Sequence, residues 1–183
     1  MSDNAFDVKP GGILSGNGYI KNLGGEFIIK NDGTLSPGRM EGYGNLTIEA
    51  DALTLQGGSK LRIRKGSHVN LLGKLVLDFS ECTDKIAIEL VDFPSYGSFD
   101  YKIFIISKEH GVYLNDEQTP LSKGKDISTH FEFGGNFAGL NVCIEDDGSI
   151  CLNGEIAASV EVLESIRKPS IFASLLAFCK GKK

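Results

Sequence analysis

Two compact groups of carboxylates are the residues of this chain best suited to acid–base chemistry. Asp78, Glu81 and Asp84 form the first group, and Glu145, Asp146 and Asp147 form the second. Paired carboxylates are the machinery of most glycosidases. The second group directly precedes Gly148, where acidic residues and glycine are favoured by turn geometry alone. We therefore expect the carboxylates to be structural and the chain not to be an enzyme. A carbohydrate-active enzyme, either a polysaccharide lyase or a glycosidase, is the alternative.

The other residue types that commonly do chemistry give weaker signals. None of the three histidines, His68, His110 and His130, lies in a metal-binding motif. The chain has no Gly-x-Ser-x-Gly nucleophile motif, no phosphate-binding P-loop and no dinucleotide-binding glycine motif that opens a helix. We expect no cofactor and no metal ion.

Three cationic residues alternate along one short segment, at Lys60, Arg62 and Arg64. Alternate residues of a β-strand point to the same face, so these side chains would form one positive row. Such a row is a candidate anion-binding face for an acidic glycan. It is equally typical of a solvated outer face, whose charges discourage pairing with other strands.

The cysteines match no zinc or redox spacing; they are Cys82, Cys143, Cys151 and Cys179. A β-hairpin is predicted over residues 142–152, because apolar residues alternate on both sides of a turn at residues 146–148. The expected register pairs Ile144 with Ile150, Val142 with Leu152, and Cys143 with Cys151. Directly opposed residues lie within disulfide range, so the two cysteines are a candidate disulfide. We favour the other interpretation, two reduced thiols side by side, because cytosolic proteins keep their thiols reduced.

Composition narrows the class of protein. The chain has 183 residues, a formal net charge of −5 and a sequence pI near 5.2. This length suits one domain, and the acidic balance argues against a nucleic-acid-binding protein, which usually carries a basic patch. The first ten residues lack the basic and apolar regions of a secretory signal peptide. We expect either a cytoplasmic protein or a segment of a longer chain.

Short apolar runs separated by glycine turns dominate residues 11–58, where 12 of 48 residues are glycine. Each run is too short to bury its own apolar face, so successive units must stack on one another. The pattern therefore predicts an all-β protein of the β-solenoid type. The expected strands up to residue 79 are 13–14, 19–21, 26–30, 34–35, 45–49, 52–55, 60–64, 68–71 and 74–79. The side chains expected inside are Ile48, Leu53, Leu55, Leu61, Ile63, Val69, Leu71, Leu75 and Leu77.

The character of the chain changes at residue 82, where glycine thins out and the strands lengthen. The strands expected here are 86–91, 101–107, 130–133, 140–144 and 149–153. We interpret this region as wider terminal coils with a closing hairpin, because a last coil without a cap would expose its edge and its core.

These patterns divide the chain into three segments. We expect a flexible lead-in over residues 1–10, a β-helix with a capping region over residues 11–154, and a helical segment over residues 155–183. The last prediction rests on helical spacing of Ile156, Val160, Leu163 and Ile166, with Pro169 ending that run. This segment would pack over the end of the solenoid, and a membrane-surface anchor is the alternative.

The order of these motifs resembles the C-terminal part of the passenger domain of classical bacterial autotransporters. That family shows Gly-x-Leu-x-Gly-x-Gly, Leu-x-Pro-Gly, Gly-x-Leu-x-Ile, Leu-x-x-Gly-Ser-x-Leu, an aromatic-led strand and a last strand, in this order. The corresponding residues here are 12–18, 35–38, 44–48, 55–61, 101–106 and 147–152, with 73–77 fitting between the fourth and fifth. The resemblance covers about residues 11–153. The chain departs from the family in having four cysteines.

The resemblance implies a right-handed parallel β-helix with a terminal capping hairpin, located at the bacterial cell surface or secreted. It implies an autochaperone or junction region, which nucleates folding of the passenger and displays an adhesin-type or virulence-type surface. Its partners would be the rest of the passenger and the outer-membrane barrel in cis, and a host surface protein or glycan. A freestanding solenoid that self-assembles end to end, as a homo-oligomer, is a further alternative. The expected folding core consists of Tyr101, Ile103, Ile105, Phe131, Phe133, Val142 and Ile150.

Overall fold

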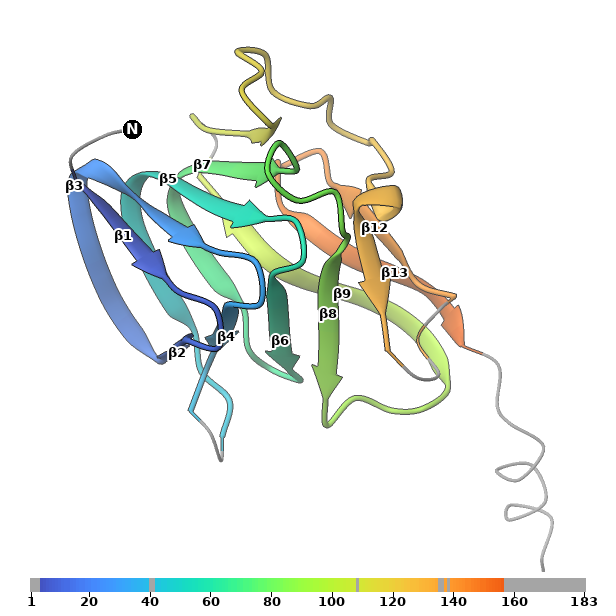
Figure 1. Cartoon of the computed structure of the whole chain (residues 1–183). Coiled ribbons are helices and arrows are strands. Elements are labelled where there is room, and N and C mark those ends of the chain that lie inside the picture. Colours follow the sequence, from blue (N-terminus) through green and yellow to red (C-terminus); the bar gives the residue numbers. More distant parts are fainter. Residues whose placement is uncertain (1–3, 40–41, 108, 135–136, 138, 157–183) are drawn as a thin grey trace, which may run out of the picture.

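The computed structural model describes residues 4–39, 42–107, 109–134, 137 and 139–156, and most of these residues lie in β-strands (Figure 1). The strands are β1 (Ala5–Val8), β2 (Ile13–Gly16), β3 (Gly18–Ile29), β4 (Thr34–Pro37), β5 (Leu46–Gln56), β6 (Lys60–Arg64), β7 (Val69–Asp78), β8 (Ile86–Val91), β9 (Gly97–Ile106), β10 (Val112–Leu114), β11 (Phe131–Phe133), β12 (Asn141–Ile144) and β13 (Ile150–Ile156). A 3-10 helix, η1 (Ser128–His130), precedes β11. Among the described residues, no helix is long and apolar enough to cross a membrane.

The strands form two sheets, and from β1 to β9 the chain alternates between them. The larger sheet has the order β1-β3-β5-β7-β9-β13-β12, with β10 also paired to β7, and the smaller has the order β11-β8-β6-β4-β2. Strands that follow one another within a sheet therefore lie side by side, and the molecule extends in chain order from β1 and β2 to β12 and β13 (Figure 1). Every pair is parallel except β12 with β13 and β13 with β9. The all-β class and the parallel pairing are confirmed.

Register shifts divide the long strands β3 and β5 into two halves. Glycine permits the close backbone approach that accompanies these irregularities. A Cβ on Gly73 of β7 would lie 2.0 Å from the carbonyl oxygen of Ala50 in the neighbouring strand. A Cβ on Gly25 would likewise lie 2.3 Å from the carbonyl oxygen of Asn4. Only glycine fits at such positions, which explains why the glycine-rich pattern accompanies stacked strands.

The core consists of apolar ladders that run across the strands in register. Four of them are Phe6–Phe27–Leu53–Leu75–Val112, Val8–Ile29–Leu55–Leu77–Leu114, Leu14–Leu35–Leu61–Ile88–Phe133 and Ile20–Ile48–Leu71–Ile106. All nine side chains expected inside between Ile48 and Leu77 are buried. Full burial of each such side chain stabilises the fold by about 1.5–3 kcal/mol.

The two ends of this arrangement differ. Among the described residues, no strand pairs with the outer edge of β1 or β2, or with residues 18–22 on the outer side of β3. Phe6, the last member of its ladder, is consequently 52% exposed, and Leu14 and Ile20 are only partly buried. We call this surface the open end.

The opposite edge of the larger sheet is covered. The predicted hairpin is present, with Val142 paired to Leu152, Cys143 to Cys151 and Ile144 to Ile150. Residues 124–128, which we call the strap, satisfy the outer edge of β12. Ile144 donates its N–H to the carbonyl of Lys125 at 3.0 Å, and Val142 donates its N–H to Ser128 Oγ at 2.8 Å. We call this surface the capped end.

Two of the sequence-based boundaries were wrong. Residues 5–8 of the expected lead-in form β1, which pairs with β3 through a register that sets Phe6 beside Phe27. Glu155 and Ile156, expected at the start of the helical segment, continue β13 and pair with β9. Ile156 packs with Phe99 and Leu140. The rest of the expected helical segment lies outside the described residues.

The expected folding core is largely buried, with one correction. Ile103, Phe131, Val142 and Ile150 are buried, and Tyr101 and Phe133 are partly buried against the core. Ile105, however, is 38% exposed. The register between β13 and β9 shifts so that Ile150 pairs with Phe104 while Cys151 pairs with Lys102. The extra residue, Ile103, reverses the alternation, so Ile103 and Phe104 both point inward and Ile105 points outward.

Candidate functional site

A groove of about 770 Å³ lies on the outer face of the second halves of β3, β5 and β7. Thr54 and Gln56 of β5 lie in it and are buried although they alternate with inward-facing Leu53 and Leu55. Its polar lining consists of Asp7, Glu26, Lys30, Thr54, Gln56, Asp78, Ser80, Glu81, Asn115 and Asp116. Five carboxylates and one lysine make this groove acidic.

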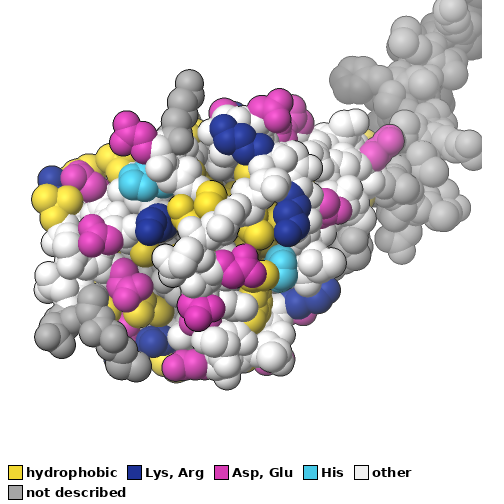
Figure 2. All heavy atoms as spheres, turned by 90° about the horizontal axis from the view of Figure 1, so that it is seen from above, with side chains coloured by type: hydrophobic (Ala, Val, Ile, Leu, Met, Phe, Trp, Pro, Cys, Tyr) yellow, Lys and Arg dark blue, Asp and Glu magenta, His cyan; other side chains and the backbone are white. Residues whose placement is uncertain are grey.

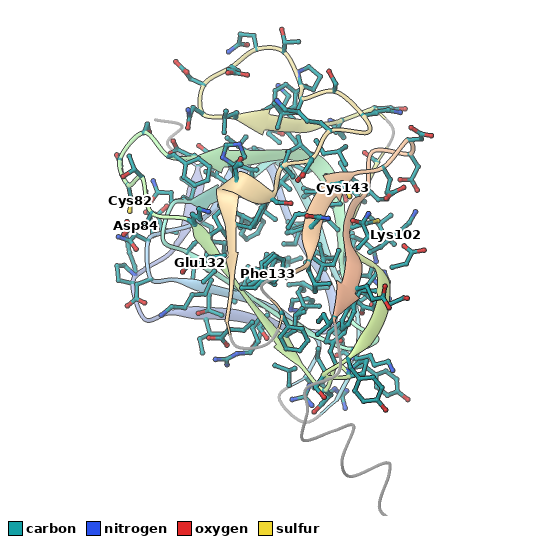
Figure 3. All side chains as sticks on the ribbon, turned by 90° about the vertical axis from the view of Figure 1, so that its right-hand side faces the viewer. Cys82, Asp84, Lys102, Glu132, Phe133 and Cys143 are labelled. Carbon is teal, nitrogen blue, oxygen red and sulfur yellow. The ribbon has the colours of Figure 1, made fainter. Side chains whose placement is uncertain are left out.

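The groove contains only part of the first predicted acidic group. Asp78 and Glu81 line it, whereas Asp84 lines a separate hollow of about 500 Å³ with Lys60, Lys85 and others. Figure 3 places Asp84 near Cys82, on the opposite side of the molecule from Lys102 and Cys143. The three carboxylates therefore do not form one site.

The environment of Asp78 favours its ionised form. Partial burial opposes ionisation, but Ser80 donates its backbone N–H at 3.0 Å and its hydroxyl at 2.6 Å to Asp78 Oδ1. These hydrogen bonds hold the pKa of Asp78 below its ordinary value. Asp78 is thus suited to act as a base or a charge, but not as the proton-donating carboxyl that glycoside hydrolysis also needs. Glu81 accepts a hydrogen bond from Gln56 at 3.3 Å.

The second predicted acidic group stabilises a turn. Asp147 forms an ion pair with Lys102 of β9, and its Oδ1 accepts the backbone N–H of Ser149 at 2.9 Å. The Lys102 hydrogen bond, followed by those from Ser149, lowers the pKa of Asp147 to about 2. These contacts tie the hairpin turn to β9, as expected for a structural group.

The row of cations on β6 is neutralised. Arg62 forms an ion pair with Glu89 at 2.7 Å. Lys60 pairs with Asp32, and Arg64 pairs with Asp92. Asp32 precedes β4, whereas Glu89 lies in β8 and Asp92 directly follows it, so the candidate anion-binding face is a row of ion pairs to the neighbouring passes of the chain. On the face shown in Figure 2, acidic and basic side chains are likewise interspersed.

The histidines have structural surroundings. Burial lowers the pKa of His68, and burial with the nearby Lys125 and Lys85 lowers the pKa of His130. The His130 ring stacks on Phe79, with ring centroids 5.2 Å apart. His110 donates its backbone N–H to the carbonyl of Ser107 at 3.0 Å. Over the described ranges, no group of three or more His, Cys, Asp or Glu side chains is arranged to hold a metal ion.

The cysteines of the hairpin face each other as free thiols. Cys143 and Cys151 occupy directly paired positions of β12 and β13. Asn153 donates its side-chain N–H to Cys143 Sγ at 2.8 Å. The predicted register is confirmed, and the structure has the reduced form of the pair. Cys179 lies outside the described residues.

Sequence reasoning missed most of the groove. Glu26, Gln56 and Asp116 belong to segments far apart in the chain, and nothing in their local sequence marks them. They converge because Gln56 lies beside Asp78 in the parallel register of β5 and β7, and because Glu26 lies beside Ala52 on β5. Register between separate strands is the signal that would have been needed.

Comparisons with known proteins add no identification. No family model matches the chain, and no match was found among curated proteins or among solved structures.

Proposed function

We propose that this chain is a non-enzymatic end module of a right-handed parallel β-helix, of the kind found at the C-terminal end of autotransporter passengers. The capped end forms first and serves as the base on which further coils fold. The module then displays its outer faces for interaction at the cell surface or in a secreted protein. The observation that carries this proposal is the difference between the capped end and the open end.

The physical basis is the cost of nucleation. In a stack in which each strand contacts only its neighbours, the first coil to fold has no partner, and each later coil adds to an existing edge. Here the capped end combines local antiparallel pairing in the hairpin with the strap, and local contacts form fastest. The open end offers unpaired strand edges and partly buried Phe6, Leu14 and Ile20, which suits it to receive the next coil.

A matched pair of substitutions tests the order of folding. Ile150 at the capped end and Ile29 near the open end are both fully buried. We expect Ile150→Val to slow refolding by up to about fivefold for each kcal/mol lost, and Ile29→Val mainly to accelerate unfolding. Stopped-flow folding and unfolding rates measured across denaturant concentrations give both values. Slower refolding in Ile29→Val than in Ile150→Val would reject nucleation at the capped end.

The second candidate function is a carbohydrate-active enzyme, and the groove with Asp78 and Glu81 favours it. The test is release of reducing or unsaturated sugar ends from pectin-like and host glycans. Activity that disappears in Asp78→Asn but persists in Asp84→Asn would support this candidate, because only Asp78 lines the groove.

End-to-end self-assembly is a third candidate, and the two ends limit its form. Head-to-tail growth needs an open edge at both ends, but the strap occupies the outer edge of β12. Light scattering over a range of concentrations distinguishes long filaments from a closed pair joined through its open ends.

A further inference from the structure

The hairpin holds two thiols in a geometry that suits a covalent bond. Cys143 and Cys151 are directly opposite in antiparallel strands, so their side chains share one face. At the turn, Glu145 donates its N–H to the carbonyl of Ser149 at 2.8 Å. Hydrogen-bonded and non-hydrogen-bonded pairs alternate along an antiparallel ladder. Cys143 and Cys151 lie two pairs away from Glu145 and Ser149, so they also form a hydrogen-bonded pair. The Cα atoms of such pairs are about 5.5 Å apart, within the range that disulfides span.

The two thiols differ in how easily they react. Cys151 is 1% exposed, and burial raises the pKa of its thiol to about 12. Cys143 is only partly buried, and burial raises the pKa of its thiol while the Asn153 hydrogen bond opposes that rise. Cys143 is therefore the thiol that an external reagent reaches first.

Charged groups on three neighbouring segments act on the pair. Lys102 and Asp100 face it from β9, Glu145 from the hairpin and Asp126 from the strap. The three carboxylates disfavour the thiolate form, and Lys102 favours it at Cys151. Figure 3 shows Lys102 and Cys143 at the same edge of the molecule. Oxidation by disulfide exchange should consequently be slow near neutral pH and faster as pH rises, because the thiolate is the nucleophile.

We propose that Cys143 and Cys151 form a redox latch that locks the capped end when the chain meets a low-molecular-weight disulfide such as oxidised glutathione. The thiolate of Cys143 attacks one sulfur of that disulfide, its S–S bond breaks, and one glutathione thiolate leaves. Cys151 loses its proton and attacks Cys143 Sγ, which expels the second glutathione thiolate. Two glutathione molecules take up the two protons, so the protein pair is oxidised and one glutathione disulfide is reduced.

The latch would fix β12 to β13 at the edge that the strap covers. A disulfide stabilises chiefly by restricting the unfolded chain, and this one closes a short loop. The inference rests on the proposed function in one respect, because a cell-surface or secreted location would supply the oxidising compartment. The paired geometry of the two cysteines does not depend on that location.

The test uses the full chain with Cys82→Ser and Cys179→Ser, which leaves only the proposed pair. The protein is incubated with oxidised glutathione, remaining thiols are alkylated, and peptides are analysed by mass spectrometry without reduction. We expect both thiols to be lost within one chain, a linked pair of peptides containing Cys143 and Cys151, and a rise in Tm of roughly 5 °C that reduction reverses. Asn153→Ala should slow the reaction of Cys143.

Three results would overturn the latch. They are two alkylated thiols after prolonged oxidation, a stable mixed disulfide with glutathione at Cys143 that never resolves, and linkage between two chains. Cys143→Ser serves as the control and should show no change in Tm on oxidation. The refolding experiment above is run with reduced protein, so failure of the latch and failure of the folding proposal are separable.

Discussion

The open and capped ends of this molecule use similar side chains in different surroundings. Phe6, Leu14 and Ile20 at the open end are the last members of ladders whose inner members are fully buried. At the capped end, Val142 and Ile150 are as buried as residues in the middle, because they pack into the main core and the strap covers the outer edge of their hairpin. Exposed strand edges invite pairing with other strands. The larger sheet is thus protected from such pairing at its β12 edge, whereas its β1 edge is left available.

The largest effect is expected from a polar substitution in the core of the capped end. Ile103→Ser removes a fully buried side chain next to the hairpin, and we expect it to lower the free energy of unfolding by about 4 kcal/mol. Ile105→Ser, on the same strand but at an exposed position, should cost less than about 1 kcal/mol. Denaturant unfolding measures both. Equal losses would mean that the irregularity in β9 is not where the structure has it.

A substitution in the middle strands tests how far stability depends on close strand contact, independently of either end. Gly73→Ala places a Cβ against the carbonyl oxygen of Ala50, so β5 and β7 must move apart. We expect the free energy of unfolding to fall by about 3 kcal/mol, which is at the upper end of the usual cost of overpacking. Gly42→Ala, where a Cβ meets nothing within 4 Å, is the matched control and should be nearly neutral. Thermal unfolding of the two variants decides whether close backbone approach is required.

Loss of one hydrogen bond between the strap and β12 tests whether the strap protects the capped end. Ser128→Ala leaves the N–H of Val142 without its hydroxyl partner, and an unsatisfied backbone group costs about 1–3 kcal/mol. Amide hydrogen exchange should increase at Val142 and its neighbours but not near the open end. Thr129→Ala, which alters an adjacent exposed residue, controls for local disturbance. Unchanged protection at Val142 in Ser128→Ala would show that the strap does not hold this edge.

The smallest expected effect concerns the ion pair that ties the hairpin turn to β9. The pKa of Asp147 is about 2 in the folded chain against an ordinary value of 3.8. Because the folded-state pKa is the lower one, this pair stabilises the fold above about pH 4, and its contribution disappears as pH falls toward 2. Lys102→Met should therefore lower Tm slightly at neutral pH and match the original chain at the acid limit. A difference that stays constant with pH would exclude Asp147 as the cause.

Local patterns were sufficient to predict the hairpin and most strands, but not β1 or β10. Turn residues and alternation placed the strand of residues 86–91 at its observed bounds, and they set Cys143 opposite Cys151. Both signals lie within a few residues of the element they specify. The lead-in was wrong because β1 is a strand through its parallel pairing with β3, which its local sequence does not show.

Features that depend on distant pairing could not be predicted. Ile105 was expected inside because unbroken alternation was assumed, and the irregularity that turns it outward comes from pairing with β13. The sequence left the cations of β6 as either an anion-binding face or a solvated face, because their acidic partners, including Glu89, come from other passes of the chain. The acidic groove depends on register between separate strands for the same reason. Sequence patterns thus determined which segments are strands, but not what each outer side chain meets.

The number of residues between paired strands varies along the chain, which bears on how such a chain can change during evolution. On the smaller sheet, 21 residues separate Ile13 from its partner Thr34, and 45 residues separate Ile86 from its partner Phe131. The longer return is accommodated outside the ladders, between β10 and η1, while Ile86 and Phe131 both remain buried. A longer return at a corner can therefore be accommodated while the ladder pair that it connects stays buried. New recognition loops could be acquired or grafted there without redesigning the core, whereas a single-residue insertion within a strand would reverse every side chain beyond it.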